Sequence, residues 1–174
     1  MTAATLQTLT LPAFAQMLEA LSTQLDKAAA HADANGGDIE AMMAARLAPD
    51  MFPLSMQVQF SCVQAIEARA RLLDAAIGAV SPVETFADAK ERLAQTIELL
   101  RGAPATENEN GDRAIALDLP NGMGFDLTLA EYVRSWALPQ FYFHLVCSYA
   151  IMRHNGVDLG KPDYVPHMFK FLRK

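Results

Sequence analysis

The spacing of apolar residues constrains this chain more than any other feature of its sequence, because it follows the helical repeat over most of the length. After Thr10, an expected helix N-cap, apolar side chains recur three or four positions apart as far as Asn35. The same spacing, with some polar exceptions, predicts a second long helix from Pro53 to about Gly78. Each pattern gives its helix an apolar stripe that must pack against another element.

Two further helices are predicted later in the chain. Capping-box sequences at Ser81 and at Thr85 are both candidate starts of the third helix, which ends at Gly102. Another capping box at Thr128 opens the fourth helix, which contains the stretch QFYFHLVCSYAIMRHNG and ends near Asn155. Because that stretch is apolar on nearly every side, we expect the fourth helix to be the most deeply buried.

The connections between these helices add two small elements. Residues 38–49 predict a helix of one or two turns, and residues 115–119 and 125–129 alternate apolar and polar side chains on either side of Asn121-Gly122, as in a hairpin. The predicted fold is therefore all-α: a four-helix bundle with a small β-hairpin between helices three and four, forming one domain over residues 1–174. Either long connection, between helices one and two or three and four, could cross over the bundle.

Composition excludes several classes of partner. The chain has 174 residues, a formal charge of −6 and a pI near 5.1, whereas a nucleic-acid-binding surface needs a basic face. No apolar run reaches the ~20 residues that span a bilayer, and the first ten residues lack an export signal, so we expect a cytoplasmic protein without a membrane partner. Cys62 and Cys147 lie far apart and have the pattern of small buried apolar residues.

Polar residues interrupt the apolar helices at regular spacing. Gln140, His144 and Ser148 stand four residues apart on helix four, and Gln57 and Ser61 begin a similar line on helix two, continued by Gln64. The two lines could face one another. His144 would then be either a hydrogen-bonded core histidine or part of a pocket for a small molecule or a metal.

Three phrases of the sequence together resemble one family. They are ARLAPDMFPL (residues 45–54), LPQFYFH (residues 138–144) and RHNGVDLGKPDY (residues 153–164). The chain resembles a bacterial branch of unknown function in the DinB/YfiT-like superfamily. The resemblance covers essentially the whole chain and implies a DinB-like bundle, commonly a homodimer. Members with an intact site are thought to hold a divalent metal with three histidines, and some act as thiol-dependent transferases or isomerases.

Carried onto this chain, the three-histidine pattern is incomplete. Its H-x-x-x-H pair falls on Gln140 and His144, and the nearest helix-two counterparts are Gln57 and Gln59. Amide oxygens bind zinc or nickel far less well than imidazole does. We therefore expect no cofactor, with a divalent ion (Zn, Ni or Fe) held by His144 and Asp50 as the alternative.

Three functional hypotheses follow from these residues. The first is a homodimeric binding or interaction module that has lost the metal site and could take a small-molecule ligand. The second is a metal- or thiol-dependent transferase or hydrolase that uses His144 in a reduced site as ligand or general base. The third is a structural or stress-associated protein without a ligand. The ending MFKFLRK fits a frayed tail, a subunit contact or a weak surface anchor.

Overall fold

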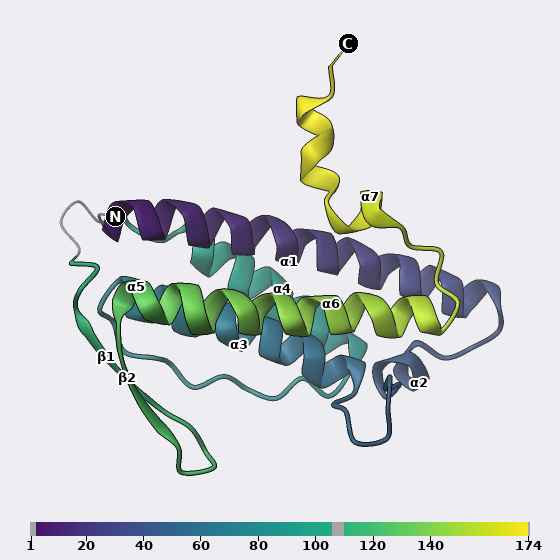
Figure 1. Ribbon diagram of the computed structural model, residues 1–174. Helices are drawn as coiled ribbons and strands as arrows, with labels where there is room; N and C mark the ends of the chain where they lie inside the picture. The colour runs from purple at the N-terminus through teal and green to yellow at the C-terminus, as the bar shows by residue number, and fades with distance from the viewer. Residues whose placement is uncertain (1–2, 106–109, 174) are drawn as a thin grey trace.

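The computed structural model describes residues 3–105 and 110–173 and confirms the predicted helical bundle with one hairpin. Residues 106–109, in the polar connection after the third long helix, lie outside the described residues. The elements, shown in Figure 1, are α1 (Ala3–Ala34), α2 (Ile39–Met43), α3 (Leu54–Leu72), α4 (Phe86–Arg101), β1 (Ala114–Asp118), β2 (Gly124–Thr128), α5 (Leu129–Tyr132), the π-helix η1 (Val133–Ala137), α6 (Leu138–His154), α7 (Lys161–Tyr164) and the 3₁₀ helix η2 (Pro166–Phe171).

Four long helical segments enclose one hydrophobic core. α1 packs along α4 and α6, and α3 packs along the same two helices from the other side. The stack of Phe14 on Phe141, with ring centroids 3.9 Å apart, joins α1 to α6 in the middle of this core. Around it lie fully buried leucines from α1, α3 and α4, including Leu18, Leu54 and Leu93.

The segment that crosses the bundle is not one of the two expected long connections but residues 73–85, between α3 and α4. Arg69 Nε donates to the Leu99 carbonyl (3.0 Å), so the C-terminal ends of α3 and α4 lie together and the two helices run parallel. Residues 73–85 therefore return along the bundle, and the Val83 N–H reaches Gln59 Oε1 (2.9 Å) near the start of α3 (Figure 1).

Helix boundaries follow the local capping signals except at the start of the first long helix and at the end of the second, where α3 ends at Leu72 and not near Gly78. Thr128 and Glu131 form the expected capping box, and Gly156, with a φ of +90°, follows the last long helix. The predicted N-cap at Thr10 is wrong, because α1 begins at Ala3 and Thr10 is buried within it. Burial of Leu6 against the core extends the helix beyond this local signal.

The fourth long helix is one rod made of α5, η1 and α6, and it is less buried than expected. Seven of the 17 residues of α6 are buried, against 11 of the 19 in α3. The difference arises because Phe143 and Val146 on α6 are about half exposed, at 55% and 48%. The apolar composition of this helix thus includes an uncovered side as well as a core side.

The hairpin covers one end of the bundle with the predicted alternation. β1 and β2 pair antiparallel with Ile115 opposite Leu127 and Leu117 opposite Phe125, and the turn contains Gly122 with a φ of +85°. Ile115 and Leu117 are buried in the core cluster, whereas Phe125 on the opposite strand is 42% exposed.

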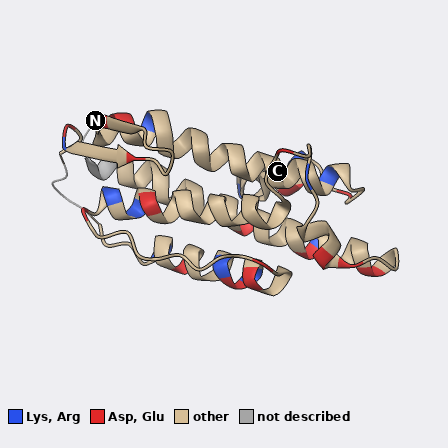
Figure 2. Cartoon of the chain, turned by 90° about the horizontal axis from the view of Figure 1, so that it is seen from below, with Lys and Arg blue, Asp and Glu red and all other residues tan. Residues whose placement is uncertain are grey.

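Charged residues are distributed over the outer surfaces of the helices. Figure 2 shows basic residues interspersed with acidic ones along the helices. Within the described part of the chain, no helix combines the length and apolar character needed to cross a membrane.

The two candidate capping boxes before α4 provide a direct test of local stability. Thr85 accepts from the Asp88 N–H and Asp88 accepts from the Thr85 N–H, whereas Ser81 lies outside the helix. Thr85→Ala should therefore lower the free energy of unfolding by about 1 kcal/mol, and Ser81→Ala should change it by less than about 0.5 kcal/mol. Urea denaturation measures both; equal effects would contradict this assignment of the cap.

Candidate functional site

The structure brings His144 and Gln57 together between α6 and α3. His144 Nδ1 and Gln57 Oε1 are 2.8 Å apart, and both side chains are buried, with 8% and 1% of their surface exposed. The two predicted polar lines therefore meet at this pair. A buried hydrogen bond between helices fixes their relative position and satisfies two groups that would otherwise lose solvation.

The backbone before α3 determines which atom Gln57 presents to His144. Gln57 Nε2 donates to the Phe52 carbonyl (3.3 Å), which can only accept. The amide oxygen must then face His144, so Nδ1 carries the proton and Nε2 keeps its lone pair. No described contact occupies Nε2, and this nitrogen is not among the fully buried atoms without a partner, so it lies at the edge of a side chain that is 8% exposed.

The phrase ARLAPDMFPL builds the turn that supplies the Phe52 carbonyl. Arg46 Nη1 donates to the Met51 carbonyl (2.6 Å), and the Leu54 N–H donates to the Ala45 carbonyl (3.0 Å). These two hydrogen bonds close residues 45–54 into a compact connection that leads into α3. The role of this phrase is thus to orient Gln57 and, through Gln57, the imidazole.

Two phenylalanines contact the imidazole, and a third packs on one of them. The ring of Phe60 lies 5.0 Å from that of His144 at an interplanar angle of 32°, and Phe143 meets the imidazole edge-on at 5.2 Å. Phe52 packs against Phe60 at 5.0 Å and is itself 46% exposed. We call Phe52, Phe60 and Phe143 the aromatic rim; they place partly exposed apolar surface beside the imidazole.

The environment of His144 keeps the imidazole neutral. Desolvation lowers the pKa of His144 from 6.5 to about 4, and the partner at Nδ1 is an amide rather than a carboxylate. At neutral pH the ring is therefore a hydrogen-bond acceptor at Nε2 with no charge.

The other predicted site residues take different places. Ser61 and Ser148 are fully buried and donate to carbonyls of their own helices, at Gln57 (2.9 Å) and His144 (3.0 Å) respectively. Gln140 is half-buried one turn before His144, and Asp50 is exposed in the connection before α3. The structure thus brings His144 and Gln57 into contact, while the two serines hydrogen-bond to backbone carbonyls of their own helices.

The polar seam between α3 and the last long helix includes the predicted Gln64 and continues beyond the predicted residues. Gln64 Oε1 and Trp136 Nε1 are buried without a hydrogen-bond partner in the described structure. Further along, the Arg71 guanidinium stacks 4.9 Å from the ring centroid of Tyr132, whose burial raises its pKa. Trp136 and Tyr132, which are not among the predicted site residues, continue the four-residue spacing of Gln140 and His144, and this spacing is the signal that could have found them.

The metal centre implied by the family resemblance requires three good donors. Within residues 3–105 and 110–173, no three side chains among His, Cys, Asp and Glu lie close enough together to share an ion. His144 contributes one imidazole nitrogen, and its partner Gln57 is a neutral amide. This set of donors does not fit the three-histidine centre of a zinc, nickel or iron protein.

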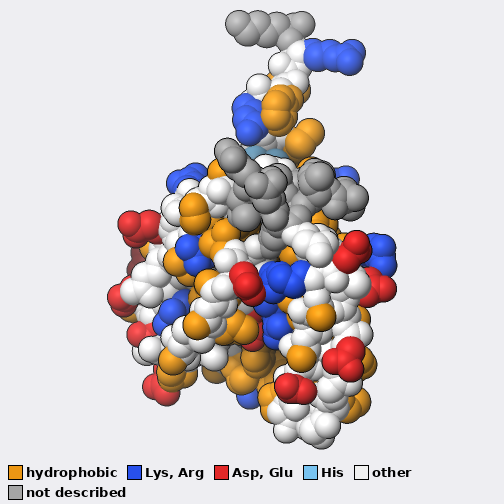
Figure 3. Space-filling view, turned by 90° about the vertical axis from the view of Figure 1, so that its left-hand side faces the viewer, with side chains coloured by type: hydrophobic (Ala, Val, Ile, Leu, Met, Phe, Trp, Pro, Cys, Tyr) orange, Lys and Arg blue, Asp and Glu red, His pale blue; other side chains and the backbone are white. Residues whose placement is uncertain are grey.

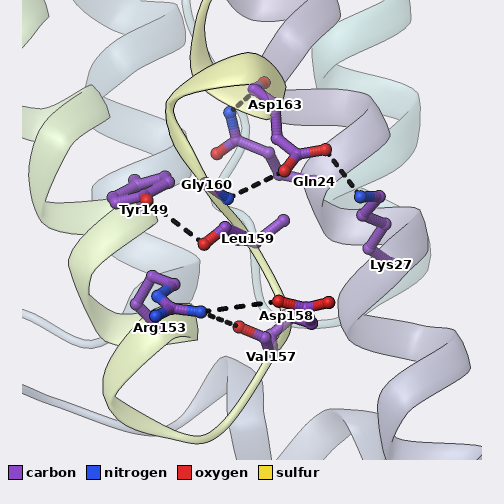
Figure 4. Close-up of polar contacts among 9 residues, drawn as sticks. All are labelled: Gln24, Lys27, Tyr149, Arg153, Val157, Asp158, Leu159, Gly160 and Asp163. Atoms are coloured by element: carbon purple, nitrogen blue, oxygen red, sulfur yellow. Dashed lines mark hydrogen bonds and ion pairs between the residues drawn. The ribbon is translucent and has the colours of Figure 1, made fainter.

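The phrase RHNGVDLGKPDY ties the end of α6 and the following segment to the bundle. Lys27 Nζ and Asp163 Oδ1 are 2.6 Å apart, Gln24 Nε2 donates to the Asp163 carbonyl (2.9 Å), and the Gly160 N–H donates to Asp163 Oδ2 (2.8 Å) (Figure 4). The hydrogen bond from Lys27 is the main cause that lowers the pKa of Asp163. Tyr149 reaches the Leu159 carbonyl at 3.4 Å. This phrase therefore has a structural role.

Comparison with known proteins identifies the same class of helical bundle. A solved structure described as a DinB family member protein from Shewanella denitrificans is 34% identical, with a TM-score of 0.81 over 94% of this chain and 93% of that chain. The model of the domain of unknown function DUF1993 matches residues 6–165. The chain belongs to this family, and the predicted DinB-like relationship is confirmed. A comparison with curated proteins finds no match.

The lowered pKa of His144 predicts a specific loss of stability in mild acid. Below about pH 6.5, His144 of the unfolded chain binds a proton, whereas His144 of the folded chain stays neutral until about pH 4. Stability therefore falls as the pH falls through this window. The full pKa shift corresponds to a change of about 3 kcal/mol in the free energy of unfolding. Because solvent near the partly accessible ring screens this effect, we expect a change of about 1 to 2 kcal/mol.

Urea denaturation at pH 7.5 and pH 5 measures this loss. His144→Gln cannot titrate in this range, so its stability should fall less than that of the wild type by the stated amount. Equal losses in the two proteins would show that His144 titrates alike in both states.

Proposed function

We propose that this protein is a binding module whose site is the unpaired Nε2 of His144 beside the aromatic rim. The ligand class that matches these groups is a small planar molecule that carries one N–H or O–H donor. The ring of such a molecule would pack on Phe60 and Phe143, and its donor would point at Nε2. The homodimer implied by the family resemblance stays a prediction.

One observation carries this proposal: the hydrogen-bonded chain from the Phe52 carbonyl through Gln57 to His144 Nδ1. This chain holds the imidazole in one tautomer before any ligand arrives, and pre-organised groups bind with a smaller entropic cost. The three groups in it are neutral, so the site favours an uncharged donor over a cation or an anion. The exposed edges of Phe52 and Phe143 supply apolar surface beside the acceptor.

The same geometry supports binding better than general-base catalysis. A general base works best when its pKa lies near the pH at which it operates. With a pKa of about 4, His144 is unprotonated at neutral pH but is a weak proton acceptor in the transition state. A carboxylate at Nδ1 would raise its basicity, and Gln57 stands in that position.

A matched pair of probes tests the proposed binding mode. Indole offers a ring and an N–H, whereas N-methylindole offers the same ring without the donor. We expect indole to shift the NMR signals of His144 and the aromatic rim and to bind at least about tenfold more tightly than N-methylindole, because an unmatched buried acceptor costs roughly 1 to 3 kcal/mol.

Two histidine variants complete this experiment. His144→Phe keeps a ring but removes the acceptor, so it should abolish the preference for indole. His154→Phe changes an exposed histidine on the same helix and should keep the preference. Equal affinity of the wild-type protein for the two probes, or no binding of either, would refute the proposed site.

We further infer that the protein does not retain a transition metal at His144. The support is the donor set, in which one imidazole nitrogen stands beside neutral amides. Protein purified without chelator should contain less than about 0.1 equivalent of zinc, nickel or iron, as expected for a single-ligand site. Elemental analysis of the wild type, His144→Ala and Asp50→Ala measures this content. Stoichiometric metal that is lost in either variant would instead support the reduced metal site and the enzyme hypothesis.

A further inference from the structure

The segment after α7 stands away from the bundle and exposes apolar side chains. We call residues 166–173, which contain η2, the arm. Figure 1 shows the arm leaving the bundle beyond α7, and Figure 3 shows hydrophobic and basic side chains on it, clear of the body. Met168, Phe169, Phe171 and Leu172 are 54%, 56%, 65% and 75% exposed.

The three-residue repeat of the 3₁₀ helix sorts the arm into polar and apolar rows. Side chains three residues apart lie on the same side, so His167 and Lys170 share one row, Phe169 and Leu172 a second, and Met168 and Phe171 a third. The row of His167 and Lys170 faces the body of the same chain, where it lines a groove. Both apolar rows therefore point away from the chain's own core.

The groove at the base of the arm is apolar along its floor. It has a volume of about 570 Å³ and runs between the first half of α1 and the end of α4. Its apolar lining includes Leu11, Pro12, Ala15, Leu100 and Ala103. Leu9, three residues before Pro12, lies on the same side of α1 and is 64% exposed, so it extends this surface at the rim.

The arm has a defined direction because its root is anchored. Asp163, three residues before η2, is held by Lys27 and Gln24 of α1 and by the Gly160 N–H (Figure 4). These contacts fix the segment from which the arm departs. An anchored arm with its apolar rows outward can reach a surface on another molecule without refolding.

Charge favours another copy of this chain as that molecule. Residues 166–174 carry Lys170, Arg173 and Lys174 and no acidic residue, so the segment has a formal charge of +3. The whole chain carries −6, which leaves −9 on residues 1–165. The basic C-terminal segment is thus attracted to the acidic body of a second copy as a whole. Within the groove itself, Glu19 is ion-paired with Arg101.

We propose that two copies of this chain exchange arms, each arm placing Phe169 and Leu172 in the α1–α4 groove of the other. The arm and the groove adjoin on one chain, so a two-fold axis between two copies brings each arm onto the partner's groove, as a closed isologous interface requires. This surface is formed by α1, α4 and the arm, whereas the His144 site lies between α3 and α6, so the arm exchange does not depend on the proposed function.

Sedimentation equilibrium tests this proposal directly. The wild type should be a dimer at micromolar concentration, and Phe169→Asp combined with Leu172→Asp should raise the dissociation constant at least about a hundredfold, as expected for loss of central apolar anchors. Both residues are exposed, so circular dichroism should show an unchanged fold. Phe143→Asp is the matched control: it alters an equally exposed phenylalanine on α6 and should leave the dimer intact.

Cysteine cross-linking then locates the contact. Phe169→Cys on one preparation and Gln16→Cys on another, mixed and oxidised, should give a disulfide-linked dimer, because Gln16 lines the groove. Cys62 and Cys147 are buried, and either variant alone should give no such product. A dimer broken by Phe143→Asp but kept by the arm variant would overturn the proposal. So would a monomeric wild type whose arm instead binds vesicles of phosphatidylcholine and phosphatidylserine.

Discussion

The hydrogen bond between Gln57 and His144 holds α3 against α6, and the rest of the candidate site depends on it. Gln57 presents its amide oxygen to the imidazole because its amide nitrogen donates to the Phe52 carbonyl. The turn of residues 45–54 therefore controls the tautomer of a histidine at least ninety residues later. The result is a neutral ring whose unpaired nitrogen lies beside the aromatic rim.

Local signals predicted most of the fold. Helical periodicity, the capping boxes at Thr85 and Thr128 and the Asn121-Gly122 turn act within a few residues, and the structure follows them. Such local signals could not predict which connection crosses the bundle, because the parallel packing of α3 on α4 depends on contacts between distant segments. Burial of α6 was overestimated for a related reason: composition shows that Phe143 and Val146 are apolar but not that they point outward.

The candidate site was predicted in outline from the spacing of its polar residues. The four-residue steps through His144 and Gln57 placed two polar lines on facing helices, and the structure joins them at one pair. The orientation of the Gln57 amide could not be predicted, since it is set by a backbone carbonyl in an irregular turn. Of the three phrases that carry the family resemblance, one builds that turn, one carries His144, and the third anchors α7 to α1.

The stacking of Phe14 on Phe141 joins residues that are 127 positions apart in the chain. Because α1 and α6 pack directly against each other, the core closes only when segments from opposite ends of the chain come together. A large loop must close before these contacts form, and its entropic cost precedes any gain from burial. Refolding of this bundle should consequently be slower than that of a helical protein of similar length whose contacts are mainly local. Partly folded chains would expose the apolar faces of α1 and α3 until α6 packs against them.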